Sequence, residues 1–163
     1  MKITSKVTSD QKQIASLIRR LQSLESHEIQ YGYFQEDTHD SSGMPISELA
    51  AILNFGTDDI PARPFMEAAS DSAGRYSQTS NEWKRSIWSY LCGNGNINQV
   101  LGKVGVVYNN FIPQAIMFGE WQANGLEWSK YKFETYGVSQ PLIETSELMA
   151  NSKVKVVKTG DKK

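Results

Sequence analysis

AAILNFGTDDIPARPF, residues 50–65, is the stretch that decides the fold. Apolar residues just before it and at its start recur at the helical spacing i, i+3, i+4, i+7, namely Ile46, Leu49, Ala50 and Leu53. We expect a helix here, capped by the hydroxyl of Ser47 and ended by Gly56, which tolerates a left-handed conformation. The following loop is predicted to be stiff, because two prolines fix their own φ and extend the residue before each of them.

Phe65 is predicted to begin the next helix from a direction that this loop defines. The loop holds no nucleophile and no general base, so we expect it to dock a partner rather than to catalyse a reaction. The predicted interface consists of Phe55, Gly56, Ile60, Pro61, Arg63, Pro64 and Phe65. Two interpretations of Arg63 stay open: a bidentate contact with a carboxylate of a neighbouring subunit, or a tie between the loop and its own helix.

These residues resemble a motif of tail-component proteins of double-stranded DNA phages, the HK97 gp10-like and tail-completion group. An apolar helix ending in Phe-Gly-Thr is followed by Ile-Pro-Ala-Arg-Pro-Phe, and a second match, PLIETSELMANS, occupies residues 141–152. The matching positions of the second stretch are Pro141, Leu142, Ile143, Thr145, Leu148 and Ser152. Ser146 stands where the family normally has Gly, so we expect a hydroxyl-capped helix start in place of the family's tight turn.

The resemblance implies a structural virion protein at the head–tail junction of a tailed phage, made in the host cytoplasm. It does not separate tail completion from tail termination or head closure in the neck. Copies are expected to form a closed ring, and the sixfold symmetry of tails makes a hexamer the expected state. The implied partners are further copies of the chain, the tail tube, the sheath as a further candidate, and the connector and closure proteins of the head.

The composition predicts one domain over residues 1–163, with a flexible tail from about 159. A chain of 163 residues can bury a sizeable core, and a net charge of −1 gives no global attraction for nucleic acid. Cys92 is the single cysteine, which excludes an internal disulfide, and we expect it to pack as a small hydrophobe at a helix end. No apolar run approaches the roughly 20 residues of a membrane span, so no membrane partner is expected.

The pattern of apolar residues predicts an α+β fold, with several helices packed on a small antiparallel β-sheet. Strands are predicted at 28–34 and 153–158, and an irregular aromatic segment at 121–136. Helices are predicted from Ser9 or Asp10 to Leu24, at 46–53, at 65–91 with an interruption at Gly74, at 98–118 with a break at Pro113, and at 143–150.

Two groups of side chains suggest chemistry, but neither predicts an enzyme. Glu36, Asp37, His39 and Asp40 could be imagined as metal ligands, yet no Cys/His pair accompanies them, so we expect a solvated loop without metal or cofactor. Glu120, Glu127 and Glu134 recur every seven residues, which leaves a carboxylate-dependent hydrolase using segment 120–136 as an alternative function. A cytoplasmic adaptor outside the virion is the third hypothesis.

The last predicted strand alternates lysine with valine. Lys153, Lys155 and Lys158 are expected to form its charged face, and three interpretations are open. Lysines at a strand edge discourage pairing with other strands, which is the default interpretation. The same face could border DNA in the tail channel, without sequence preference, or pair with acids on a partner.

Overall fold

The computed structural model describes residues 4–39, 42–143 and 146–160, and its exposure values begin at Asp10. The chain divides into two compact units. Unit 1 is built from residues 1–30, 79–105 and 155–163, and unit 2 from residues 31–78 and 106–154. Thr145 and Asp40, named above as a motif residue and a metal candidate, lie outside the described residues. The prediction of a single domain stays a prediction.

Unit 1 contains α1 (Thr4–Glu25), α4 (Asn81–Leu91) and most of α5 (Ile97–Asn109). Helices α1 and α4 are in contact. Arg20 of α1 links the two helices through Tyr90 of α4. Its Nη1 donates to the carbonyl oxygen of Tyr90 at 2.9 Å, and its guanidinium carbon lies 5.1 Å from the centre of the Tyr90 ring. This contact combines a charged hydrogen bond with a cation–π interaction.

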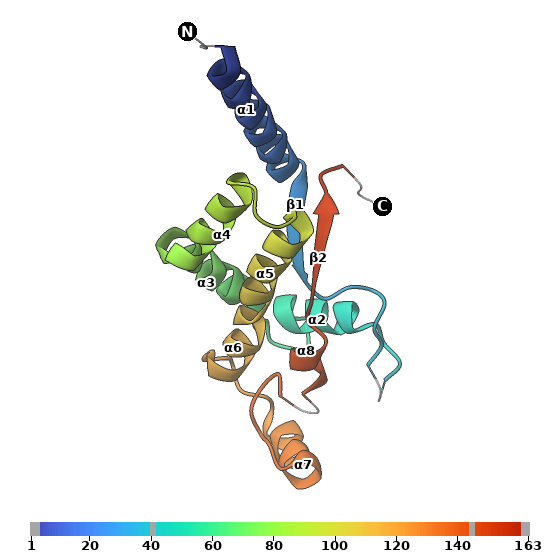
Figure 1. The fold of residues 1–163 in the computed structure, drawn as a ribbon. Helices are drawn as coiled ribbons and strands as arrows, with labels where there is room; N and C mark the ends of the chain where they lie inside the picture. Colours follow the sequence, from blue (N-terminus) through green and yellow to red (C-terminus); the bar gives the residue numbers. More distant parts are fainter. Residues whose placement is uncertain (1–3, 40–41, 144–145, 161–163) are drawn as a thin grey trace. The chain divides into compact units, whose positions relative to one another are not determined.

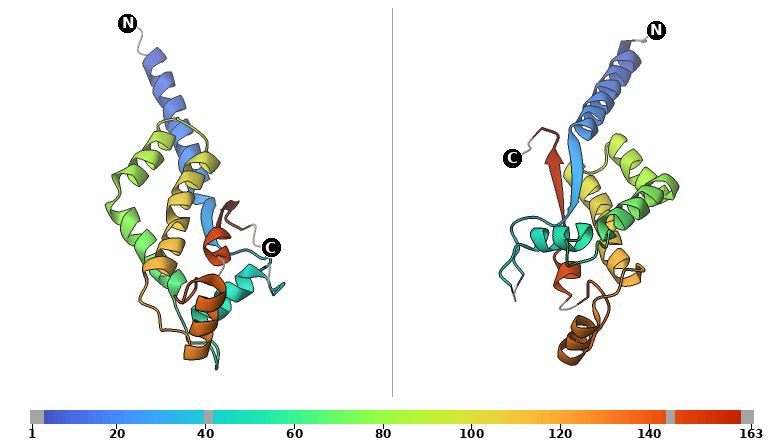
Figure 2. Two further views of the ribbon diagram at one scale, coloured as in Figure 1. Left: turned by 90° about the horizontal axis from the view of Figure 1, so that it is seen from below. Right: turned by 180° about the vertical axis from the view of Figure 1, so that it is seen from behind.

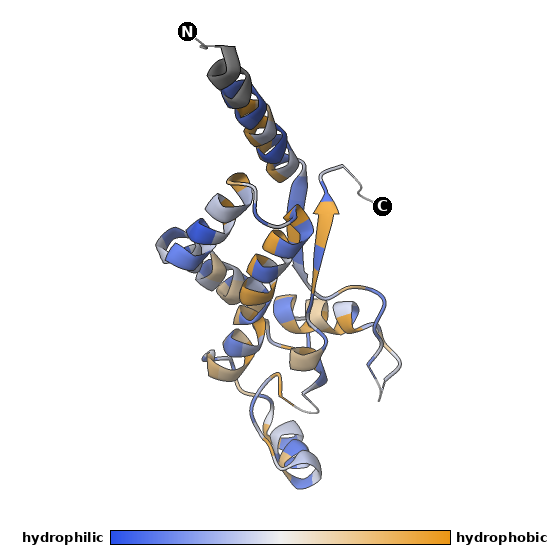
Figure 3. Ribbon diagram, in the orientation of Figure 1, coloured by the Kyte–Doolittle hydropathy of each residue, from blue (hydrophilic) through white to orange (hydrophobic). Residues whose placement is uncertain are grey.

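Helix α1 begins earlier than predicted, at Thr4, so Ser9 and Asp10 lie inside it and do not cap it. The apolar residues of this helix recur at helical spacing and form a stripe, and orange and blue residues alternate along α1 in Figure 3. The stripe is nevertheless exposed, with relative exposures of 41–57% at Ile14, Leu17, Ile18 and Leu21. The predicted helix is therefore confirmed, but among the described residues these four side chains are not part of the buried hydrophobic cluster.

In the described part of the chain two strands form a small sheet, which confirms the predicted α+β class. Strands β1 (His27–Gly32) and β2 (Lys153–Lys158) pair in antiparallel directions, and the pairing continues where the Thr159 amide donates to the Ser26 carbonyl at 2.9 Å (Figures 1 and 2). Strand β1 ends at Gly32, two residues before the predicted end. The boundary between the units falls inside both strands.

Unit 2 holds the main hydrophobic core. Its helices are α2 (Ile46–Phe55), α3 (Phe65–Thr79, whose last residue belongs to unit 1), α6 (Phe111–Phe118), α7 (Leu126–Tyr136) and α8 (Glu147–Ala150). The buried cluster consists of Ile46, Ala50, Phe65, Ala69, Ile112, Ile116, Leu142 and Leu148. The two motif stretches, far apart in sequence, therefore contribute to one core. None of the helices in the described ranges combines the length and hydropathy needed to cross a bilayer.

Several predicted element boundaries are wrong. The long helix at 65–91 is interrupted at Ser80 rather than at Gly74, and the Ser80 hydroxyl accepts a capping hydrogen bond from the Trp83 amide at 3.2 Å. The helix at 98–118 breaks at Asn110, so Pro113 falls in the first turn of α6, where its missing N–H removes no helical bond.

The segments near the two motifs also differ from the prediction. Part of the aromatic stretch predicted to be irregular is helix α7, and the last short helix begins at Glu147 instead of residue 143. Helix α2 is confirmed, but Ser47 does not cap it. Pro45 occupies the cap position, where no side chain accepts a hydrogen bond.

Candidate functional site

The loop from Phe55 to Phe65, called the proline loop below, is fixed at both ends by backbone hydrogen bonds. Gly56 ends α2 with its amide donating to the Ile52 carbonyl at 2.8 Å, and the Thr57 amide donates to the Ile60 carbonyl at 2.8 Å. The Arg63 amide returns to α2 and donates to the Leu53 carbonyl at 3.1 Å. The chain thus folds back on the helix it has just left, and the predicted stiffness has a direct physical basis.

Gly56 has the predicted positive φ of 75°, but its ψ of 177° is extended rather than left-handed helical. This combination is open almost only to glycine. A Cβ atom placed on Gly56 would lie 2.6 Å from the Ala62 nitrogen and 2.7 Å from the Ile60 oxygen. The glycine therefore serves close backbone approach as well as the end of the helix.

The Arg63 side chain is used within its own chain. It is 2% exposed, its Nε donates to the carbonyl oxygen of Gln122 at 3.0 Å, and its Nη2 donates to Oδ1 of Asn124 at 2.8 Å. Burial lowers the pKa of the Arg63 guanidinium, because desolvation disfavours its charged form. The geometry favours the intrachain interpretation, although the tie runs to the segment before α7 and not to a helix beside the loop.

Asn54 is a structural residue that the sequence analysis missed. It is 3% exposed, its Oδ1 accepts from the Met66 amide at 3.0 Å, and its Nδ2 donates to Oε1 of Glu67 at 3.1 Å. The side chain of one helix thereby caps the start of the next. Pro64 could have indicated this role in the sequence. It precedes α3 and has no capping side chain, so a cap from another part of the chain could be expected.

The predicted interface residues differ in how exposed their side chains are to a partner. Phe55 is 72% exposed and Pro64 is also exposed, whereas Gly56, Ile60 and Pro61 are half-buried. Phe65 is fully buried in the core, as Arg63 is buried beside it. A partner docking on the proline loop would therefore meet Phe55 and the prolines, and the interface itself stays a prediction.

Two described residues of the second motif stretch, Leu142 and Ser146, have a left-handed conformation, both with φ of 64°. Ser146 keeps the conformation that glycine favours at this position and precedes α8, yet its hydroxyl makes no capping bond. The expected hydroxyl-capped start is therefore wrong. Ser152 has a structural role, because its carbonyl and hydroxyl oxygens accept from Nδ2 of Asn109 at 3.1 and 2.9 Å. Pro141 and Ile143 are half-buried there.

Tyr33 connects the chain after β1 to this stretch. Its hydroxyl donates to the Leu148 carbonyl at 2.6 Å, and its ring packs edge-on against Phe65 with centroids 6.3 Å apart. Burial raises the pKa of the Tyr33 phenol, because the apolar surroundings disfavour the phenolate. Tyr33 therefore helps to hold the two motif stretches together.

A cavity of about 660 Å³, called the loop cavity below, lies within unit 2. Its apolar wall includes Leu49, Leu53, Ile60, Pro61, Trp128, Leu142 and Leu148. Its polar lining consists of His39, Ser42, Asp59, Arg63, Asn124, Lys132, Ser146 and Glu147. The cavity thus collects residues from the proline loop, from α7 and from the second motif stretch.

The described members of the imagined metal site make contacts within the protein. Over the described ranges, no three His, Cys, Asp or Glu side chains come together as ligands. Asp37 pairs with Lys153, its Oδ1 lying 2.6 Å from Nζ, and His39 Nε2 lies 3.4 Å from Oε2 of Glu147. These side chains therefore have protein contacts that connect the 37–39 segment to the C-terminal part of the chain.

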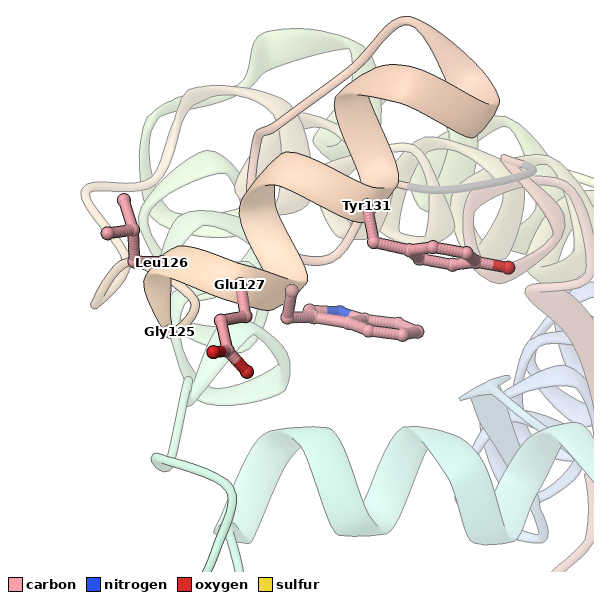
Figure 4. Close-up of a pocket in the computed structure, with 5 residues that line it drawn as sticks. Gly125, Leu126, Glu127 and Tyr131 are labelled. Carbon is pink, nitrogen blue, oxygen red and sulfur yellow. The ribbon is translucent and has the colours of Figure 1, made fainter.

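The three glutamates do not share a cleft. Glu127 and Glu134 lie on α7, Glu120 precedes that helix, and all three are exposed. Glu134 pairs with Lys130 one turn earlier, with Nζ and Oε1 3.9 Å apart. A hollow of about 580 Å³ on α7 is lined by Glu127, Tyr131 and three neighbours (Figure 4). It contains one carboxylate, so it does not supply the pair that glycoside hydrolysis requires.

The remaining candidates are at the surface. Cys92 is exposed at the C-terminal end of α4, so the prediction that it packs as a small hydrophobe is wrong. Strand alternation places Lys158 on the face opposite Lys153 and Lys155, so the three lysines do not form the single face that was predicted.

Comparison with known proteins gives no match. No family model, no curated protein sequence and no solved structure matches this chain.

Proposed function

We propose that the protein is a structural virion protein at the head–tail junction of a tailed bacteriophage. In this role, copies form a closed ring that completes or terminates the tail and joins it to the head connector. The proposal starts from the two motif stretches of the sequence. One structural observation carries it furthest: the stretches contribute to one core, which supports a stiff loop whose Phe55 side chain remains 72% exposed.

The exposed apolar surface of unit 2 supports an assembling protein. Besides Phe55, large apolar side chains are exposed at Phe118 (76%), Leu126 (88%) and Phe133 (64%). Isolated exposed hydrophobes are ordinary, but so many large ones on a chain of this size favour protein–protein contacts. Aromatic residues are also enriched where interfaces gain most of their binding energy.

A ring follows when each copy offers two different surfaces. Contacts of one surface with the other give a closed ring if the rotation returns to its start, and a filament if it does not. The exposed stripe of α1 and the proline loop are two such surfaces on one chain. The sixfold state is carried over from the resemblance, as are the tail tube, the sheath and the head connector as partners. The hydrolase and adaptor alternatives gain no specific observation.

Exposed side chains give a sharp test of assembly. Phe55→Ser and Leu126→Ser should leave the thermal midpoint close to that of the unchanged protein, because neither side chain is buried. Both should lower the molar mass measured by light scattering, alone and with tail-tube protein. Trp88→Ser is the matched control, since Trp88 is 68% exposed but lies on α4 of unit 1. A strict monomer under both conditions would refute the ring.

The virion role needs a second experiment. In a tailed phage that carries this gene, deletion of the gene should give full heads and separate tails, visible by electron microscopy. Purified protein added to such an extract should restore joined particles, and Phe55→Ser should restore fewer. Joined, infectious particles in the absence of the gene would contradict the proposal.

A further inference from the structure

The loop cavity has the size and wall chemistry of a small-molecule site. Its volume of about 660 Å³ falls within the range of roughly 300–1,000 Å³ that is typical of ligand pockets. Its wall is mostly apolar, with Leu53, Ile60 and Trp128 among the lining residues. Ligand pockets commonly combine such walls with a few polar groups that orient the ligand, so the polar groups decide its class.

Arg63 contributes a buried positive charge that no carboxylate balances in the described part of the chain. Its two hydrogen-bond acceptors, the Gln122 carbonyl and the Asn124 amide oxygen, are neutral. A guanidinium has five N–H groups, and these two bonds use two of them. Buried charges are normally paired, because an isolated charge is costly in an apolar environment. Arg63 therefore has both charge and donors left for an anion.

Asn124 adds a second unsatisfied group beside Arg63. Its Oδ1 accepts from Arg63, but its Nδ2 is buried and finds no acceptor among the described residues. Lys132, 2% exposed, is another buried cation of the lining and donates from Nζ to the Gln140 carbonyl at 2.9 Å. The remaining N–H groups of Arg63 and the Nδ2 of Asn124 thus leave hydrogen-bond donors on this wall for a ligand.

We propose that the loop cavity binds a small organic acid, a carboxylate on an apolar chain or ring. The carboxylate accepts hydrogen bonds from the remaining N–H groups of Arg63, which suit two-point contact with two oxygens. The apolar body of the ligand lies against Leu53, Ile60 and Trp128. This binding site is independent of the virion role proposed above.

Octanoate is a suitable probe, with octan-1-ol as the uncharged control and octylamine as the cationic one. Each is titrated into the full chain while Trp fluorescence is followed, and Trp128→Phe shows whether the signal comes from the cavity. Octanoate should bind saturably with one site per chain, at least about tenfold more tightly than octan-1-ol, because hydrogen bonds to a charged group add that much. Equal affinity for the acid and the alcohol would overturn the proposal.

A variant that supplies an internal carboxylate separates binding from folding. Asn124→Asp places an acid where Oδ1 already lies 2.8 Å from Nη2 of Arg63, so the fold should be retained and octanoate affinity should fall about tenfold or more. Gln122→Glu is the matched control, because it adds the same charge two residues away on an exposed side chain that does not line the cavity. Unchanged affinity in Asn124→Asp, or an equal loss in Gln122→Glu, would contradict the proposal.

The carboxylate could instead belong to a second copy of the chain, and sedimentation distinguishes the two sources. Octanoate binding without any change in the sedimenting mass supports a free acid as the ligand. Dissociation of an oligomer by octanoate would overturn the free acid and assign the carboxylate to a neighbouring copy. A chain that binds octanoate but stays monomeric both alone and with tail-tube protein would retain this site while refuting the ring, so the two proposals fail separately.

Discussion

Replacement of Gly56 by alanine tests how the proline loop is held. Gly56 has φ 75° and ψ 177°, and an added Cβ would lie 2.6 Å from the Ala62 nitrogen and 2.7 Å from the Ile60 oxygen. Both neighbours are backbone atoms. The Ile60 carbonyl accepts from Thr57, and the Arg63 amide holds the chain to α2, so neither can move without loss of a hydrogen bond.

The expected cost combines two terms. A non-glycine residue in this backbone region costs about 1–3 kcal/mol, and forcing an extra atom into a packed site costs about 1–3 kcal/mol more. The sum, roughly 2–6 kcal/mol, is a large part of the roughly 5–15 kcal/mol that keeps an ordinary domain folded. For Gly56→Val, backbone strain alone suggests about 1–2 kcal/mol, and the contacts with Ile60 and Ala62 raise that expectation.

Urea unfolding followed by far-UV circular dichroism measures this loss of stability. The midpoint temperature of thermal unfolding should fall by about 5–20 °C. Gly137→Ala is the matched control. Gly137 also has a positive φ, 73°, at the end of α7, but nothing lies within 4 Å of its added Cβ. The Gly137→Ala substitution should lower the free energy of unfolding by about 1 kcal/mol. If Gly56→Ala costs no more than Gly137→Ala, the argument from backbone contact is refuted.

Three further predictions concern other contacts. Tyr33→Phe should lose about 1 kcal/mol at pH 7 with its bond to the Leu148 carbonyl. Because burial raises the folded-state pKa of Tyr33, that residue's contribution is complete below the unfolded pKa of about 10 and is lost as pH rises beyond it. Urea midpoints from pH 7 to 11 should therefore decline less in the Phe variant, and parallel declines would contradict this. Asn54→Ala should lower the free energy of unfolding, measured in urea, by about 1–2 kcal/mol, which is more than the loss expected from removing a solvent-exposed capping side chain. A loss under about 0.5 kcal/mol would contradict the capping role of Asn54. Changing Glu120, Glu127 and Glu134 together to Gln should alter stability by less than about 0.5 kcal/mol and leave phage particles intact. Intact particles that fail to degrade a cell-wall polymer would instead support the hydrolase.

The sequence predicts the elements well where one local signal dominates. The i, i+3, i+7 spacing of Ile46, Leu49 and Leu53 identifies α2, and the Lys/Val alternation identifies β2. Boundaries failed where two signals competed. Gly74 is tolerated inside α3, while Ser80 caps α4 and ends the preceding helix, because a capping hydrogen bond outweighs the modest cost of one helical glycine.

The candidate site was predicted only in part, because its contacts join segments that are far apart in the chain. The stiffness of the proline loop follows from its own residues. The tie from Arg63 to Asn124 spans 61 residues and has no local signature. The cap from Asn54 to α3 likewise depends on how the loop returns to its starting helix. The burial of Phe65 and the exposure of Phe55 also depend on tertiary packing, since both are aromatic residues at helix ends.

The pairing of β1 with β2 has a consequence for synthesis on the ribosome. The first residue of β2, Lys153, is added more than a hundred residues after β1 has been made. At roughly 5–20 residues per second, β1 waits about 6–25 s for its partner. During that interval its backbone donors and acceptors face water or any other strand within reach, and such edges promote aggregation. The nascent chain should therefore depend on chaperones or on a low local concentration of unfinished copies. A ribosome stalled before residue 153 should carry an aggregation-prone intermediate.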